Sequence, residues 1–509
     1  MGYSDVRDKT APALTAQPEM SVRPVLFLAV GRAIAMVVTF ATPLVLARVF
    51  DQAAFGTYKQ LFLIGGTLAV IAQLGMAESL LYFLPSAPRR GGQYVLNALL
   101  VLGASGLTCL GLFVLSGTWL ARWLGNAALS GLAGLLGLYV LFMLPAALLE
   151  IVMTARKRYK GAGAAYGLSD LFRAIALVAP GLLTGRLEWM LAGAAVFAAV
   201  RLSATLLYLR WEFGAELRPD AALLRNQLAY ALPFQLGGAL WILVLNLHYY
   251  LVASSVDAAT FAIYAVGCLQ IPLVELLFTP AKNVMMVRMR EAITAHRMGA
   301  EIVIWRDTVR KLAMVFFPLV GLLLVTAQEL IPVLFTARYA ASVPIFMIWS
   351  LIILIVPLQA DGVLGVYADT RFLAALYGIQ LLLNAGLVFV LMRPFGLLGA
   401  VMATGLAMGC GKSLLLVRAK RLMGATFADL LPWRKLAEVL AATAACAAVT
   451  LEVKSHLPAA PLPLLVMAVG AYLFVYLGIL AVRGALDAGA VQATTDRIRL
   501  LLGWSAKAP

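Results

Sequence analysis

Residues 50–58 read Phe50-Asp51-Gln52-Ala53-Ala54-Phe55-Gly56-Thr57-Tyr58, a short stretch that separates two long apolar segments. The stretch recurs in the second half of the chain, with Asp, Ala, Phe and Tyr at the same spacing, as Val256-Asp257-Ala258-Ala259-Thr260-Phe261-Ala262-Ile263-Tyr264. A second pair of similar segments begins at Tyr166-Gly167-Leu168 and at Tyr377-Gly378-Ile379. The duplication predicts two helical halves of like orientation, which is typical of transporters with a binding site between the halves.

The composition indicates that this chain is embedded in a lipid membrane. Of the 509 residues, 63% are hydrophobic and only 13% are charged, and the mean hydropathy is +0.93; a soluble domain carries about 25% charged residues. Apolar runs recur that are long enough to cross about 30 Å of hydrocarbon as helices. We therefore expect an all-α polytopic membrane protein with fourteen spans, at 25–47, 61–84, 94–116, 128–153, 163–183, 189–209, 227–253, 260–281, 312–335, 343–368, 372–392, 397–417, 436–453 and 463–483.

The basic residues test this map independently. With the N-terminus in the cytoplasm, 30 of the 40 Lys and Arg fall on cytoplasmic segments and seven on the opposite side. This bias is what the positive-inside rule predicts for a protein with both termini inside. The net charge of +16 therefore reflects topology and contact with anionic membrane lipids, and we expect no nucleic-acid partner.

The polar residues argue against catalysis, a metal site or a cofactor. The predicted loops include no large domain, and only His248, His296 and His456 are available as imidazole ligands. The four cysteines fall inside spans with no metal or disulfide spacing and are interpreted as packing residues. The segment Gly409-Cys410-Gly411-Lys412-Ser413 resembles the end of a phosphate-binding loop, but Leu406 stands where that motif needs Gly. We interpret it as a helix contact.

Several segments carry a family resemblance: Leu46-Ala47-Arg48-Val49-Phe50 with Phe55-Gly56-Thr57-Tyr58, Gln73-Leu74-Gly75-Met76, Tyr230-Ala231-Leu232-Pro233-Phe234, Glu329-Leu330-Ile331-Pro332-Val333-Leu334-Phe335 with Tyr339 and Ala341, Asn384, and Phe395-Gly396-Leu397-Leu398-Gly399-Ala400. Together they resemble the bacterial Wzx-type flippases of lipid-linked oligosaccharides, whose superfamily also holds lipid II flippases and multidrug/toxin exporters. The resemblance covers most of residues 25–420. Thr336 departs from it, because relatives usually have Gly before the Tyr.

The resemblance implies two six-helix lobes in a V around a central cavity, followed by two peripheral helices. On this basis we expect seven segments along the chain: a cytoplasmic tail at 1–24, the N-lobe at 25–210, a linker at 211–226, the C-lobe at 227–417, a cytoplasmic loop at 418–435, spans thirteen and fourteen at 436–483, and a cytoplasmic tail at 484–509.

The expected substrate is a polyprenyl-diphosphate-linked oligosaccharide, so charged groups at membrane depth are the first candidates for its site. Arginine and lysine suit a diphosphate, and we expect this role for four cations: Arg32, Arg173, Arg201 and Lys282. Three of them also have a structural alternative. Arg32 and Lys282 lie near cytoplasmic span ends and could reach the surface there, and Asp170 lies three residues from Arg173 and could neutralise it.

Span seven offers groups that suit a sugar, of which we expect Asn246 and His248 to contact the glycan; a place in the interfacial aromatic belt is the alternative for this segment. For coupling to an ion gradient we expect buried carboxylates, namely Glu78, Asp170, Glu275 and Asp361. The alternative for Asp361 is a satisfied packing carboxylate.

The resemblance thus predicts a flippase of the bacterial inner membrane that exports a repeat unit of O-antigen, capsule or exopolysaccharide. Its expected partners are the lipid-linked substrate, membrane lipids and, in the same machinery, a polysaccharide polymerase and glycosyltransferases. Two alternatives within the superfamily are a lipid II flippase and a multidrug/toxin exporter. A polytopic enzyme or a membrane assembly factor is the alternative from a different class.

Overall fold

A computed structural model describes residues 22–297, 299–457 and 460–482. Throughout these residues the chain forms helices and turns, with no strand, as the all-α prediction requires. Residues 1–21 of the predicted N-terminal tail (1–24), and all of the predicted C-terminal tail (484–509), lie outside the described residues.

The first half of the chain forms six spans, built from α1 (Val22–Val49), α2 (Gln52–Ala72) continued by α3 (Met76–Ser86), α4 (Gly91–Trp123), α5 (Ala128–Ala146) continued by α6 (Leu148–Ala155), α7 (Tyr159–Thr184) and α8 (Leu187–Phe213). The break between α2 and α3 falls at Leu74 and Gly75, which have positive φ angles of 50° and 67°. Helices α1 and α7 pack backbone to backbone, because a Cβ added to Gly31 would lie 2.0 Å from the carbonyl oxygen of Gly163. Small residues permit such close crossings in membranes.

The second half repeats this plan with α9 (Ala221–Ala253), α10 (Ala258–Gly267) and α11 (Pro272–Thr294), α12 (Ala300–Phe335), α13 (Val343–Leu351) and α14 (Ala360–Val366), and α15 (Thr370–Leu422). Helices α10 and α11 form one span bent by 51°. A short 3₁₀ segment, η3 (Ala337–Ser342), follows α12. Between them stands Thr336, with φ 89° and ψ 159°, a backbone conformation that Gly adopts far more readily than other residues. This explains why relatives are expected to carry Gly there.

Twelve helices of the described ranges are long and apolar enough to cross a membrane, and the bent pair α10–α11 makes thirteen. The 53-residue helix α15 contributes one more span, because it turns back on itself at Gly396 (φ 55°, ψ −133°). In a continuous helix, residues 384 and 404 would lie about 30 Å apart. Instead the Thr404 hydroxyl donates to Asn384 Oδ1 over 3.4 Å. The total of fourteen confirms the predicted count, including the boundary between 372–392 and 397–417.

The last two spans, α17 (Trp433–Ser455) and α18 (Pro461–Val482), follow the short helix α16 (Phe427–Leu430) and pack on α12. The Lys454 ammonium binds Glu329 Oε2 at 2.8 Å and the Val325 carbonyl at 2.7 Å. Tyr472 of α18 lies against Gly321, where an added Cβ would come within 2.4 Å of its hydroxyl. The pair is therefore anchored to the second lobe.

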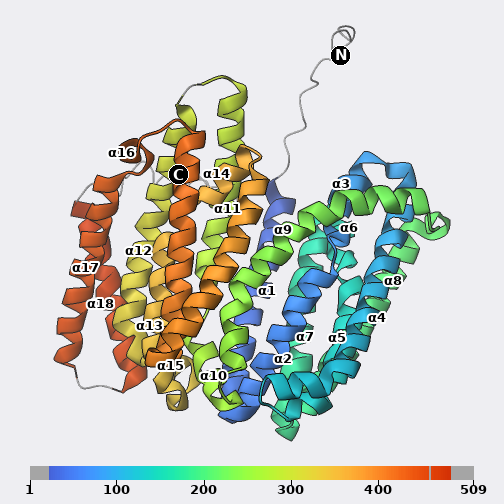
Figure 1. Cartoon of the computed structure of the whole chain (residues 1–509), viewed down its shortest axis with the longest axis horizontal. Coiled ribbons are helices and arrows are strands. Elements are labelled where there is room, and N and C mark those ends of the chain that lie inside the picture. Colours follow the sequence, from blue (N-terminus) through green and yellow to red (C-terminus); the bar gives the residue numbers. More distant parts are fainter. Residues whose placement is uncertain (1–21, 298, 458–459, 483–509) are drawn as a thin grey trace, which may run out of the picture.

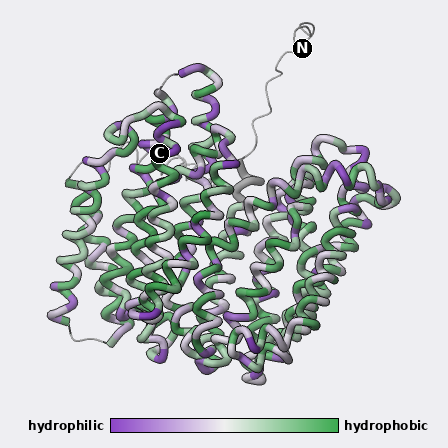
Figure 2. Tube along the Cα trace, viewed as in Figure 1, coloured by the Kyte–Doolittle hydropathy of each residue, from purple (hydrophilic) through white to green (hydrophobic). Residues whose placement is uncertain are grey.

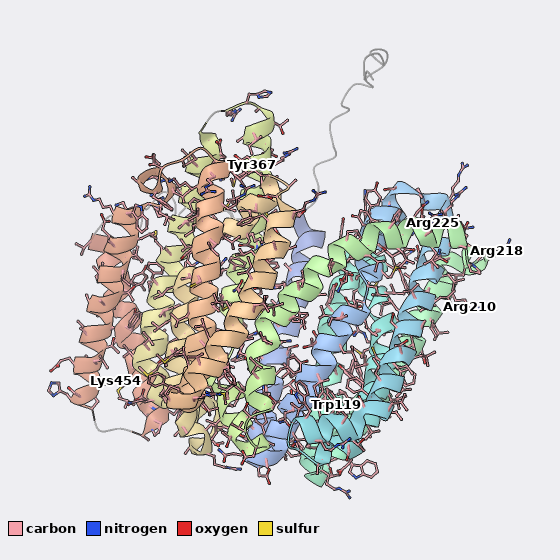
Figure 3. The ribbon with its side chains drawn as sticks, viewed as in Figure 1. Trp119, Arg210, Arg218, Arg225, Tyr367 and Lys454 are labelled. Atoms are coloured by element: carbon pink, nitrogen blue, oxygen red, sulfur yellow. The ribbon has the colours of Figure 1, made fainter. Side chains whose placement is uncertain are left out.

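The helices form two groups that meet at one end and diverge at the other, which is the predicted V (Figure 1). An apolar band runs through the middle of the helices, and polar residues gather at their ends (Figure 2). One end, which we call the basic end, carries Arg210, Arg218, Arg225 and Tyr367; the other, the distal end, carries Trp119 and Lys454 (Figure 3). The lobes meet at the distal end.

Candidate functional site

The duplicated segments cap the first hairpin of each lobe. The carboxylate of Asp51 accepts a hydrogen bond from the Ala54 amide at 2.7 Å, and Asp257 accepts one from the Thr260 amide at 2.7 Å. These are N-caps of α2 and α10, the role that Asp fills well. The bonds from Thr260 hold the pKa of Asp257 below its usual value. The Asp of each repeat therefore starts a span, and its carboxylate is already occupied.

The two capped hairpins also touch each other. A Cβ added to Gly56 of α2 would lie 1.7 Å from the carbonyl oxygen of Ala258 in α10. The backbones of the two lobes are thus in direct contact at the distal end, at the pseudo-symmetric position that the duplication defines. Only Gly fits at such a crossing.

Arg48, at the distal end of α1, forms hydrogen bonds with α12 beside this contact. Its guanidinium donates hydrogen bonds to the carbonyls of Leu334 and Val333, each over 2.6 Å. These carbonyls belong to the last turn of α12, where the helix leaves acceptors without partners and carries partial negative charge. Gln52 adds a bond from Nε2 to the Arg338 carbonyl at 2.7 Å.

Aromatic rings fill the space behind these polar contacts. Phe55 of α2 is fully buried, and its ring lies 6.5 Å from that of Phe335 and 5.7 Å from that of Tyr339, both in edge-on geometry. We call the inter-lobe contact formed by Arg48, Gln52 and Phe55 with residues 333–339 the distal seal. The lobes are closed to each other at the distal end.

Helix α9 crosses from one lobe to the other (Figure 1). Its amide side chains form hydrogen bonds with the first lobe. Near the basic end Gln227 Nε2 donates to the Ser79 hydroxyl at 2.9 Å. Farther along, Asn246 Nδ2 donates to the Thr67 hydroxyl at 2.7 Å, and Gln235 Nε2 donates to the Val70 carbonyl. Asn246, the predicted sugar ligand, is therefore engaged with α2 in this conformation.

His248, the other predicted sugar ligand, is fully buried in the second lobe. Its Nδ1 lies 2.7 Å from the Tyr264 hydroxyl, and its ring packs against Tyr249 and Trp349 with centroids 4.1 and 5.3 Å away. The histidine contributes to lobe packing here, so contact with a glycan would need a rearrangement of this cluster.

The second lobe brings together three charged residues from three helices. Lys282 of α11 and Lys412 of α15 both bind the carboxylate of Asp361 in α14; the Lys412 ammonium lies 3.2 Å from Oδ1 and from the Leu358 carbonyl. The three side chains keep 27%, 21% and 15% of their exposure in the order Lys282, Lys412, Asp361. We call Lys282 and Lys412 the lysine pair; together with Asp361 they carry one net positive charge.

Lys412 was missed by the interpretation of residues 409–413 as a plain helix contact. The signal that could have revealed it is a lysine five residues inside the predicted span 397–417, where a charge needs a partner or water. By contrast, Lys282 and Asp361 were both predicted, and the structure joins them.

The first lobe neutralises two of the predicted cations internally. Arg201 binds Glu150 Oε1 at 2.7 Å, with side-chain exposures of only 13% and 2%. Arg173 binds Asp170 Oδ1 at 2.7 Å and the Thr39 hydroxyl at 2.8 Å, which is the pairing foreseen from their spacing. Glu150 was missed, because its partner stands fifty-one residues away in sequence.

Three predicted residues have no ion-pair partner within the described ranges. Arg32 of α1 is exposed and lies over the Tyr166 ring, 5.1 Å from its centroid. Glu275 of α11 is exposed and accepts a bond from the Thr279 hydroxyl. Glu78 of α3 is half-buried, and its Oε2 has no hydrogen-bond partner there. These groups are available to a ligand or an ion.

Arg32 and the lysine pair lie at similar depths. Arg32 stands ten residues from the start of α1, and Lys412 ten residues from the end of α15, so both lie about 15 Å of helix from the basic end. They come from different lobes. Among the described residues, no group of three His, Cys, Asp or Glu could hold a metal ion. The arrangement suits an anion taken up between the lobes from the basic end.

Comparison with known proteins identifies the family. Residues 45–344, more than half of the chain, match the family model described as "Polysaccharide biosynthesis protein". A search of curated protein sequences finds no significant match.

Among solved structures, an inward-closed lipid II flippase MurJ aligns with a TM-score of 0.72 at 10% identity, covering 91% of this chain and 99% of MurJ. An inward-facing multidrug transporter of the MATE family and MOP superfamily aligns with a TM-score of 0.59 at 14% identity, covering 79% and 100%. A MOP-superfamily transporter from Pyrococcus furiosus gives 0.55 at 13%, covering 80% and 96%. The chain belongs to the polysaccharide biosynthesis protein family and is a multi-pass membrane protein with the fold of these transporters.

Proposed function

We propose that the protein is a flippase that moves a polyprenyl-diphosphate-linked oligosaccharide across the bacterial inner membrane by alternating access. The observation that carries the proposal is the asymmetry of the V: the distal end is sealed, whereas the lobes diverge at the basic end and hold cations at membrane depth. Family membership adds that the chain serves polysaccharide biosynthesis, and the fold is one that supports rocking of two lobes.

The cations suit the diphosphate. Arg32 offers a planar guanidinium, which pairs with phosphate through two hydrogen bonds. Lys282 and Lys412 offer point charges that Asp361 holds in place when the site is empty. A diphosphate that binds the lysines competes with Asp361 for the same ammonium groups. In the absence of substrate, the Asp361 carboxylate occupies the position that the diphosphate would take.

This competition also supplies a route for coupling. Protonation of Asp361 would release both lysines, and its return to the charged state would displace the diphosphate. Glu78 and Glu275 are further candidates, because they have no ion-pair partner in the described part of the chain. Asp170 is engaged by Arg173 and is a weaker candidate. An ion gradient or the membrane potential would then drive the cycle.

The basic end is proposed to face the cytoplasm, because the positive-inside rule places Lys- and Arg-rich segments there. Substrate then enters from the side where the glycan is assembled and leaves through the distal seal. Glycosyltransferases would act before this protein and a polysaccharide polymerase after it.

A lipid II flippase is the second candidate, favoured by the TM-score of 0.72 with MurJ. The two substrates share a polyprenyl diphosphate, so the proposed charged site fits both. A multidrug exporter fits less well, because Arg32 and the lysine pair would repel cationic drugs.

The experiment is a flipping assay in proteoliposomes, with lipid-linked oligosaccharide, lipid II and a cationic dye as parallel substrates. A membrane-impermeant glycosidase would report which glycans have reached the outside. We expect lipid-linked oligosaccharide to be moved, and Arg32→Ala to reduce the rate about tenfold or more, the loss expected for a bidentate phosphate contact. The matched control is Arg186→Ala, an exposed distal arginine paired with Glu188, which should flip normally. Unchanged flipping by Arg32→Ala would show that Arg32 does not bind the substrate. Movement of the dye alone would reject the proposal.

A further inference from the structure

One cation on α2 has no role in the site described so far. Lys59 of α2 is half-buried, and its ammonium lies over the rings of Phe55 and Tyr58, 5.4 and 5.8 Å from their centroids. No carboxylate forms an ion pair with it among the described residues. The other partly buried cations of the spans behave differently, since Arg173, Arg201, Lys282, Lys412 and Lys454 all bind a carboxylate.

A charge at membrane depth needs a partner, water or a ligand. Aromatic faces supply part of that compensation, but a cation–π contact is weaker than an ion pair with a desolvated anion. Lys59 is therefore held in place yet not neutralised, which is the state expected of a site that accepts an anion for part of a cycle.

The position of Lys59 is set by Phe55. The two residues are four apart on α2 and so share one face of the helix. Phe55 lies in the distal seal against Phe335 and Tyr339, and Lys59 follows one turn, or about 6 Å, toward the basic end. The backbone of Lys59 is thus placed one turn behind the seal, on the side from which a substrate would arrive, and its ammonium reaches back over the Phe55 ring.

Lys59 is also too far from Arg32 for both to hold one phosphate group. Arg32 lies seventeen residues from the distal end of α1, or about 25 Å of helix, and Lys59 lies seven residues from the distal end of α2, or about 10 Å. Arg32 and Lys59 thus differ by about 15 Å in depth, and they mark two successive positions on the route of a substrate across the membrane.

We propose that Lys59 is a second anion site, which holds the diphosphate of the substrate behind the distal seal before release. The inference rests on the proposed function. In the empty protein the ammonium lies on the rings of Phe55 and Tyr58; when the diphosphate leaves Arg32 and the lysine pair, it binds Lys59. Phe55 is part of the seal and lies one turn from Lys59 on α2. Anion binding at Lys59 therefore acts on the same helical turn that must move for the seal to open.

The test compares binding with transport. Lys59→Met removes the charge and keeps the length, and Lys59→Arg keeps the charge. The matched control is Lys420→Met, because Lys420 lies over the Phe427 ring at 4.3 Å near the basic end, away from the seal. Undecaprenyl diphosphate is the probe for equilibrium binding to purified protein, and flipping of the lipid-linked oligosaccharide is measured in proteoliposomes.

We expect Lys59→Met to bind the probe within about twofold of the unmodified protein, since the first site is intact, and to flip at least about tenfold more slowly, as loss of a charged phosphate contact implies. Lys59→Arg should restore most of the rate, and Lys420→Met should match the unmodified protein.

Equal flipping by Lys59→Met and the unmodified protein would overturn the inference while leaving the flippase intact. A loss that Lys59→Arg fails to restore, accompanied by a lower melting temperature, would assign Lys59 to packing and also overturn it. Absence of flipping by the unmodified protein would reject the proposed function itself, so the two failures are distinguishable.

Discussion

Replacing Arg48 by Ala should open the distal end. The guanidinium makes two inter-lobe hydrogen bonds of 2.6 Å to carbonyls at the end of α12. Bonds to a charged group contribute about 1.5–3 kcal/mol each where they are shielded from water. Arg48 is exposed, so water replaces part of what is lost, and we discount the total to about 1–2 kcal/mol. That free energy corresponds to a change of about 5- to 30-fold in the ratio of open to closed seal.

The ratio can be measured by pulsed electron spin resonance in lipid. Spin labels at Arg186→Cys and His456→Cys, in a protein without native cysteines, report the separation of the two lobes at the distal end. Both side chains are exposed, and within the described ranges each forms its only ion pair with a carboxylate of the adjoining helix, so labelling should leave the seal intact. Arg48→Ala should increase the population with long separations by the factor given above.

The control is Arg122→Ala, an exposed arginine at the distal end of α4 that makes no hydrogen bond to the second lobe among the described residues. Its distance distribution should equal that of the unmodified protein. If Arg48→Ala also leaves the distribution unchanged, the two short bonds contribute nothing to closure of the distal end.

Three further predictions concern stability and coupling. Glu150→Gln leaves the buried Arg201 without its counter-charge, and loss of one partner of a buried pair typically costs about 3–5 kcal/mol; a melting temperature equal to that of the unmodified protein would contradict the pairing. Asp361→Asn removes the carboxylate that competes for two lysines, so undecaprenyl diphosphate should bind more tightly; weaker binding would argue against competition. Thr336→Gly relieves a backbone conformation that costs about 1–3 kcal/mol in other residues, so thermal unfolding should shift upward, and a downward shift would show that the Thr side chain is needed.

Most of the fold could be predicted because each span is a local property of the sequence. Apolar runs determine where helices lie, and the alternation of basic loops determines their direction, so even the turn at Gly396 inside α15 fell between two predicted spans. The duplicated Asp-x-Ala-x-Phe segments predicted the two halves, because Asp51 and Asp257 start their helices with a bond to an amide three residues away.

The site was predicted less completely, because it depends on how helices rotate and cross. Asp361 is joined by Lys282 and by Lys412, at separations of 79 and 51 residues, and no periodicity in the chain reveals which faces meet. His248 illustrates the converse: its place in span seven suggested a ligand, whereas the crossing of α9 with α10 and α13 buries it. Arg173 with Asp170 was foreseeable, since partners three residues apart share a helix face.

In the proposed mechanism, substrate crosses only when the distal seal opens, and a cross-link across the seal would therefore stop transport. Gln52→Cys and Arg338→Cys place two thiols across the seal, where the Gln52 side chain now meets the Arg338 backbone. A short, reducible bifunctional thiol reagent would lock the seal in proteoliposomes that are then assayed for flipping of lipid-linked oligosaccharide. We expect locking to abolish flipping and reduction to restore it. Flipping at an unchanged rate through a locked seal would show that substrate does not cross at this end through the seal.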